Sequence, residues 1–155
     1  MIAYVFLRPQ NGSDAKLSQN LNDVRQTQML SMLENPTAAE RMKAVGYTEE
    51  LNSVNDKVVD ALLFTLNTDA NENVRLATLD ALTQLANNPK VREGLVSSIV
   101  RQESELMQVA LADAMLHLQE KRSLKSFKKL LKGESVTNDM IRKKLEQTVR
   151  QLETI

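Results

Sequence analysis

The sequence predicts an all-α fold, an α-solenoid of stacked antiparallel helical hairpins, and three observations carry this prediction. Apolar side chains recur at helical spacing in one segment after another, and no stretch alternates long enough to indicate a strand. Only 4 glycines and 3 prolines interrupt the 155 residues, of which 42% are hydrophobic and 3% aromatic. The pattern of apolar and small residues also repeats every 33 or 34 residues, as in helical-repeat proteins.

The N-terminal part of the chain predicts two helices separated by a proline. The first covers residues 13–35, capped at Ser13-Asp14 and stopped before Pro36, because proline cannot continue a helix. The second begins at Thr37, whose spacing to Glu40 predicts a reciprocal capping box.

The middle of the chain predicts three further helices with clear boundaries. Asn55-Asp56 caps the first of them, and a polar turn over residues 67–73 follows it. The next helix covers Val74–Ala86. Pro89 then occupies the first position of another helix, where its missing N–H group costs nothing.

The C-terminal part predicts the last three helices. Leu106–Leu118 is apolar on most of its faces, which indicates a helix buried between neighbours. Residues 124–131 form the next helix, which ends at Gly133, and Thr137 caps the last one. The apolar residues of that last helix are Ile141, Leu145, Val149 and Leu152.

The internal repeat aligns whole helices with one another. Residues 74–85 match residues 107–118 at an offset of 33, so that Asp80 falls on Asp113, and residues 58–66 match 91–99 at the same offset. Small residues at matched places let adjacent helices approach closely, while leucine and valine fill the layer between them. These small residues are Ala61, Ala77, Ala81, Gly94, Ala110 and Ala114.

Residues 66–82 resemble the HEAT-repeat pattern, which consists of a leucine, an Asp-containing turn, Val-Arg and then alanines. Ile141-Arg142 and Met42-Lys43 echo the Val-Arg step, whereas Met107-Gln108 departs from it. In HEAT proteins the aspartate and the arginine form a ladder between neighbouring turns. The resemblance therefore implies structural roles in the turn for Asp69 and Arg75, and a stack of HEAT hairpins that binds other proteins.

A narrower resemblance concerns a family of membrane-anchored regulators. The segments Gln28–Pro36, Ala39–Val45 and Asp60–Leu62 are similar to the C-terminal half of bacterial anti-sigma-factor-like proteins. Those proteins carry a cytoplasmic zinc-finger segment, one transmembrane helix and an outer HEAT domain. The resemblance covers about residues 1–152 and implies a place in the bacterial envelope, on the periplasmic side of the inner membrane. The zinc-finger segment has no counterpart, so no sigma-factor binding is implied.

The apolar run Met1–Leu7 has two interpretations. Seven residues are too few to cross a bilayer, which takes about twenty, so the run alone favours a short strand or a packed arm. The resemblance instead makes it the end of a transmembrane helix. We expect residues 1–12 to form an apolar stub and linker, and residues 13–155 the HEAT-like domain. Membrane contact is expected only through a segment upstream of or including residues 1–7, and the alternative location is the cytoplasm.

Neither a catalytic nor a metal site is predicted. The chain has no cysteine, which excludes thiolate chemistry, and its single histidine, His117, excludes a pair of histidine ligands. Asp80 and Asp113 recur at one repeat position, which favours packing over paired acid–base catalysis. The sequence therefore predicts a protein that is not an enzyme and uses no cofactor and no small-molecule substrate.

Polar side chains on the second helix of each predicted hairpin form its inner surface, and this surface is predicted to bind another protein. The candidate partner-binding residues are Lys57, Asp60, Arg92, Glu93, Ser97, Arg101, Lys125 and Lys128. The alternative partner is nucleic acid, because residues 119–155 carry ten basic and five acidic side chains and residues 121–132 place their lysines on one helix face. Only Phe127 lies among these lysines as an aromatic neighbour, which favours a solvated terminal repeat and hence a protein partner.

Overall fold

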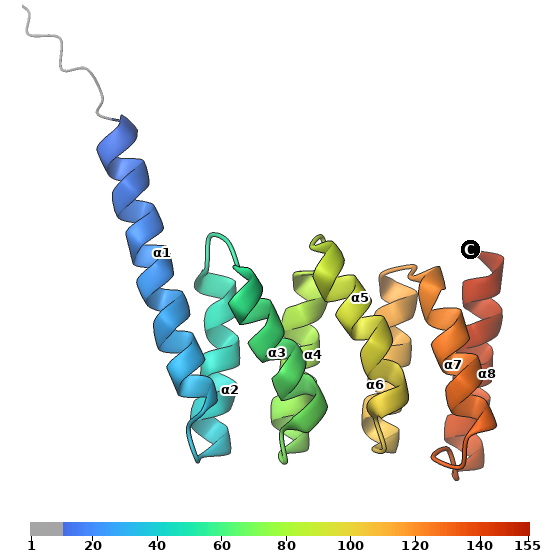
Figure 1. Ribbon diagram of the computed structural model, residues 1–155. Helices are drawn as coiled ribbons and strands as arrows, with labels where there is room; N and C mark the ends of the chain where they lie inside the picture. Colours follow the sequence, from blue (N-terminus) through green and yellow to red (C-terminus); the bar gives the residue numbers. More distant parts are fainter. Residues whose placement is uncertain (1–10) are drawn as a thin grey trace, which may run out of the picture.

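A computed structural model describes residues 11–155, and this part of the chain is all-α, without a strand (Figure 1). The predicted fold class is confirmed at this level, whereas the expectations for Met1–Leu7 lie outside the described residues. The α-helices are α1 (Asn11–Leu33), α2 (Ala38–Gly46), α3 (Asp56–Thr68), α4 (Glu72–Gln84), α5 (Pro89–Ser98), α6 (Glu105–His117), α7 (Leu124–Lys132) and α8 (Asp139–Thr154). Short 3-10 segments are η1 (Tyr47–Glu50), η2 (Ile99–Arg101) and η3 (Lys121–Ser123).

The helices stand in two layers that run along the molecule. In the odd-numbered layer α1 packs on α3, α3 on α5, and η2 at the end of α5 on α7. In the even-numbered layer α2 packs on α4, α4 on α6 and α6 on α8. Figure 1 shows that tight turns join the two helices of each pair at one edge, which we call the lower edge, and that connections at the opposite, upper edge lead to the next pair.

Apolar side chains from both layers fill the space between them as one continuous core. Leu62 and Leu95 of the odd-numbered layer and Leu82 and Leu111 of the even-numbered layer are fully buried. Gly94 lies at a close contact of α5 with α3, since a Cβ atom there would lie 2.3 Å from Cδ1 of Leu63. The predicted use of a small residue at this position is confirmed.

Side-chain caps begin five of the helices, and those of the even-numbered layer recur at the repeat spacing. Their side-chain oxygens accept backbone N–H groups of the first helical turn, which have no partner within a helix. The capping residues are Asn55, Asn71, Asn88, Ser104 and Asn138. The predicted cap at Asn55 and the predicted first-turn place of Pro89 are confirmed.

The capping box predicted at the start of α2 is not formed. Thr37 is the N-cap residue, but its side chain accepts no N–H group of the helix. Its hydroxyl instead donates to Oδ1 of Asn35 at 2.9 Å, and the same oxygen accepts the Thr37 N–H group. Asn35 therefore organises this turn from outside the helix, and the reciprocal arrangement with Glu40 is lost.

Two other helix starts differ from the prediction. The helix α1 already begins at Asn11, so that Ser13 and Asp14 lie inside it rather than capping it. At the start of α8, Asn138 and not Thr137 is the cap, because its amide oxygen accepts the N–H groups of the second and third helical residues. Figure 1 shows the first half of α1 extending past the upper edge of the other helices.

Candidate functional site

The eight predicted partner-binding residues all lie in the odd-numbered layer, which holds the first helix of each pair joined by a tight turn and not, as predicted, the second (Figure 1). Lys57 and Asp60 are on α3, Arg92, Glu93 and Ser97 on α5, Arg101 on η2, and Lys125 and Lys128 on α7. Arg92 is half-buried and the other seven are exposed. We call the exposed side chains of α3, α5, η2 and α7 the odd-layer face.

An apolar feature of this face was missed by sequence analysis. Phe64 of α3 is 69% exposed, and Val100 of η2 is 40% exposed. Phe64 borders a groove of about 560 Å³ between the ends of α1 and α3, together with Leu30, Ala61 and Thr68. The signal was available, because Phe64 falls outside the apolar stripe of its helix and an aromatic residue on a polar helix face is unusual.

Ion pairs engage two of the exposed predicted charges, Asp60 and Lys128. Lys90 lies with its Nζ 2.7 Å from Oδ1 of Asp60 and 3.7 Å from Oδ2 of Asp56. The hydrogen bond with Asp60 is the main reason why the pKa of Lys90 is raised. Lys128 pairs with Glu153 of α8 at 2.5 Å. Among the described residues, Lys57, Arg101 and Lys125 enter no ion pair, so their charges face solvent.

Arg92 is bound inside the chain at the upper edge. Its Nε donates to the carbonyl oxygen of Ala86 at 2.8 Å, and its Nη1 donates to that of Leu118 at 3.2 Å. The same Nη1 lies 3.1 Å from Oε2 of Glu120. The guanidinium group therefore ties the connection between α4 and α5 to the one between α6 and α7, and we build the candidate surface on the other seven residues.

The carboxylate of Glu120 is the centre of this upper-edge contact. It is almost fully buried and also accepts Nε and Nη2 of Arg122, each at 2.7 Å. These hydrogen bonds, with that of Arg92, lower the pKa of Glu120 to about 2. The preceding residue, Gln119, has a φ of 50°, a left-handed conformation that lets the chain leave α6.

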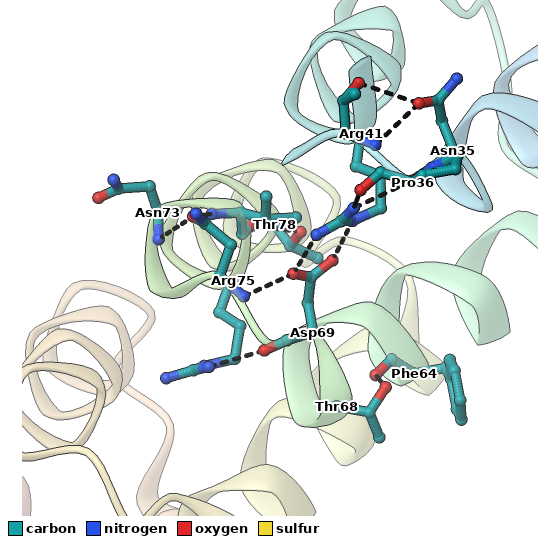
Figure 2. Close-up of polar contacts among 12 residues, drawn as sticks. Asn35, Pro36, Arg41, Phe64, Thr68, Asp69, Asn73, Arg75 and Thr78 are labelled. Atoms are coloured by element: carbon teal, nitrogen blue, oxygen red, sulfur yellow. Dashed lines mark hydrogen bonds and ion pairs between the residues drawn. The ribbon is translucent and has the colours of Figure 1, made fainter. Parts of the chain in front are cut away.

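At the lower edge, Arg41 and Asp69 join neighbouring turns (Figure 2). Nε of Arg41 lies 2.6 Å from Oδ2 of Asp69, and Nη2 lies 2.9 Å from Oδ1. This bidentate contact is the main cause of the lowered pKa of Asp69 and the raised pKa of Arg41. Arg75 contacts Asp69 differently, because its Nη1 donates to the Asp69 main-chain carbonyl at 2.7 Å. The ion pair that links neighbouring turns is thus Arg41–Asp69. The contact between Asp69 and Arg75 lies within the single turn that joins α3 to α4.

The contact of Arg75 is one of a series. The fourth residue of each even-numbered helix donates from its side chain to the carbonyl oxygen six residues earlier. The pairs are Arg41 to Asn35 at 2.9 Å, Arg75 to Asp69 at 2.7 Å, Gln108 to Gln102 at 3.0 Å and Arg142 to Val136 at 2.8 Å. Gln108 therefore makes the contact of the arginine although its residue type departs from the Val-Arg pattern, and Arg41, rather than Lys43, is the counterpart of Arg75.

Several properties of the described part bear on chemistry and on location. Within residues 11–155, no three side chains of the metal-binding types are grouped so that they could hold an ion. No helix there combines the length and the apolar character needed to cross a membrane. No family model matches the chain, and a comparison with curated proteins finds no significant match.

Proposed function

We propose that the chain is a non-catalytic protein-interaction module, an α-solenoid of HEAT-like hairpins that binds a protein partner on the odd-layer face. The observation that carries this proposal is the exposed ring of Phe64 beside its groove. Exposed aromatic side chains next to an apolar hollow are typical of binding surfaces, since they supply much of the binding free energy when a partner covers them.

Repetition supports the HEAT-like part of the proposal. The caps Asn71, Ser104 and Asn138 begin successive even-numbered helices at matched positions, and the fourth residue of each helix makes the same contact with the preceding turn. A stack of equivalent hairpins exposes one side of each layer along its whole length, and repeat proteins use such extended surfaces for binding.

The odd-layer face combines one apolar anchor with charges of both signs. Phe64 offers a ring that a partner can bury, and Lys57, Glu93 and Arg101 add exposed charges from three elements of the same face. Charges at the rim of an interface mainly select the partner and its orientation, whereas the buried aromatic residue carries the affinity.

A photo-crosslinking experiment tests this proposal. A photoreactive phenylalanine analogue replaces Phe64 in the full chain, and a matched control carries it at Leu106, which is 51% exposed on α6 in the other layer. We expect one partner to be captured at Phe64 only. The purified partner is then expected to bind the Phe64→Ala variant at least tenfold more weakly, and Leu106→Ala with unchanged affinity. Equal capture at both positions, or unchanged affinity of Phe64→Ala, contradicts the proposal.

Nucleic acid is the second candidate partner, and the lysines of α7 favour it. Lys125, Lys128, Lys129 and Lys132 line an open groove of about 610 Å³ with Leu124. Binding of a short DNA duplex, measured between 50 and 200 mM salt, separates the two candidates. A steep linear fall of log affinity with log salt concentration supports nucleic-acid binding, because each neutralised phosphate releases counterions. A shallow dependence, with affinity unchanged by Lys125→Ala, supports the protein partner.

The envelope location is a further part of the proposal, and the resemblance to the outer domain of anti-sigma-factor-like proteins supports it. Protease treatment of intact bacterial spheroplasts that make the natural protein tests it. We expect the helical domain to be cleaved from outside, as for a domain on the periplasmic side of the inner membrane. Protection until the cells are lysed points to the cytoplasm instead.

A further inference from the structure

The even-numbered layer carries a groove that the proposed function does not use. It is open to solvent, measures about 490 Å³ and lies between α4 and α6. Leu76 and Leu79 of α4 and Ala110 and Ala114 of α6 give it an apolar floor, and Asp80 and His117 stand at its rim. Its position on the layer opposite to the odd-layer face makes it independent of the proposed partner site.

The internal repeat identifies the counterpart of this groove one hairpin further along the stack. Counted from the caps Asn71 and Ser104, Asp80 and Asp113 occupy the same ninth position of their helices. Counted from Ser104 and Asn138, Ala110 and Lys144 occupy the same sixth position. The pair Asp80 and Ala110 between α4 and α6 therefore corresponds to the pair Asp113 and Lys144 between α6 and α8.

A lysine side chain occupies the counterpart. Nζ of Lys144 lies 2.8 Å from Oδ1 of Asp113. At the α4–α6 position Ala110 provides only a methyl group, and no ion pair within residues 11–155 includes Asp80, whose nearest recorded polar contact is the Gln84 amide at 3.5 Å. The groove thus has the carboxylate of the repeat but lacks the lysine that accompanies it in the next hairpin.

We propose that the α4–α6 groove binds a lysine side chain of a partner protein. The ammonium group pairs with Asp80 as Lys144 pairs with Asp113, and the four methylene groups of the stem lie on the apolar floor formed by Leu76, Ala110 and Ala114. Charge complementarity selects the occupant, because the carboxylate of Asp80 at this groove, which no ion pair within residues 11–155 neutralises, attracts an ammonium group and repels an acidic side chain.

An NMR titration of the ¹⁵N-labelled full chain at low ionic strength tests the proposal with a defined probe. The probe is the blocked tripeptide Ac-Ala-Lys-Leu-NH₂, and its neutral control carries Nε-acetyl-lysine. We expect the lysine peptide to shift the amides of residues 79–84 and 110–117, and the acetylated peptide to do so at least fivefold less at equal concentration. Shifts confined to α3, α5 or α7, or equal shifts with both peptides, overturn the proposal.

Two variants locate the contact. Asp80→Asn is expected to remove the shifts, whereas Glu49→Gln, which removes an exposed carboxylate outside the groove, leaves them unchanged. Ala110→Lys restores the residue found at the equivalent place in α8, so we expect the variant to fold with an unchanged thermal midpoint and to lose the peptide-induced shifts. An Ala110→Lys variant that folds and still binds the peptide with undiminished affinity contradicts the proposal.

Discussion

The fourth residue of the even-numbered helices shows how one side chain sets the geometry of a turn. Arg41 donates to the carbonyl oxygens of Asn35 and Pro36 and, at the same time, binds both oxygens of Asp69. Both partners of the ion pair are largely removed from solvent, with side-chain exposures of 16% and 5%. Such a shared, desolvated guanidinium group fixes the turn before α2 against the turn before α4.

Arg41→Lys tests the importance of this geometry, because lysine keeps the charge but loses the planar group that contacts four acceptors at once. We expect the free energy of unfolding, measured by urea denaturation, to fall by about 1–3 kcal/mol. The same substitution at Arg101, exposed on η2, is expected to change it by less than about 0.5 kcal/mol. Equal effects at the two sites contradict the structural role of Arg41.

The carboxylate of Glu120 at the upper edge is expected to make the stability of the protein depend on pH. The pKa of Glu120 is lowered from 4.5 to about 2 in the folded chain, chiefly by Arg122 and then by Arg92. A depressed folded-state pKa stabilises the protein fully above the ordinary pKa, and this contribution is lost as the pH falls toward 2. Glu120→Gln is therefore expected to cost on the order of 2 kcal/mol at pH 7 and progressively less below pH 4.5.

Denaturant unfolding of the unmodified protein and of Glu120→Gln, measured at several pH values between 7 and 2, gives the loss of free energy of unfolding at each pH. Glu49, exposed on η1, provides the control, because Glu49→Gln is expected to alter the free energy of unfolding by less than about 0.5 kcal/mol. A loss for Glu120→Gln that stays constant across the pH range shows that packing, rather than charge, is what the substitution removes.

At the scale of the helix, the contact of α5 with α3 depends on the absence of one side chain. Alanine normally stabilises a helix interior by about 1 kcal/mol relative to glycine. At Gly94 the added Cβ would lie 2.3 and 2.6 Å from the two terminal carbons of Leu63, closer than packed carbon atoms allow. The added methyl group therefore fits only if the Leu63 side chain moves or the helices separate, and the cost of that movement sets the sign of the change in stability.

A double-mutant cycle separates these effects. We expect Gly94→Ala alone to destabilise the protein by about 1–3 kcal/mol, as overpacked core positions do. In a Leu63→Ala background the same substitution is expected to be neutral or to stabilise by up to about 1 kcal/mol, because only the helix propensity remains. Thermal unfolding of the four proteins gives the coupling, and additive effects of the two substitutions would falsify the close approach.

The order of the helices could be predicted from apolar periodicity, but the residue that begins each helix could not always be. Thr137 and Asn138 are both competent caps in sequence, and the choice depends on tertiary contacts. Val136 is buried and its carbonyl oxygen is bound by Arg142, which fixes the chain two residues before the cap Asn138. The role of Gln108 could not be predicted because its residue type departs from the Val-Arg pattern, although its position in the helix is the same and its side chain makes the equivalent contact.

The candidate surface was predictable in part. Periodicity places Lys57, Glu93 and Arg101 on the polar side of their helices, and the structure exposes all three. The ring of Phe64 was missed because apolar residues are normally assigned to the core. The long reach of Arg92 to Glu120, 28 residues away, depends on how hairpins stack and has no local signature in the sequence.

For the whole molecule, packing in a row implies that stability varies along the chain. The main contacts of each helix are with its own pair and with the adjacent pairs, so a helix at the end of the row has neighbours on one side only. Residues 12–21 of α1 are all exposed, and Asn22 is the first buried residue of that helix. The helices α4 and α6, by contrast, have neighbours on both sides within their layer. Local opening is therefore expected to need little free energy in the first half of α1 and the most in α4 and α6.

Amide hydrogen exchange and a pair of proline substitutions test this gradient. We expect protection of the amides of residues 15–20 to be close to that of an unfolded chain, while amides at the centres of α4 and α6 exchange only through global unfolding.

Proline in the middle of a packed helix costs about 3 kcal/mol or more, so Ala112→Pro, at a fully buried position of α6, is expected to lower the free energy of unfolding by at least that amount. Gln19→Pro interrupts the exposed part of α1, where few contacts are at stake, and is expected to cost less than about 1 kcal/mol. Comparable losses for the two variants would show that the first half of α1 is held in place by the rest of the molecule, and that stability is shared along the whole chain rather than built up between neighbouring hairpins.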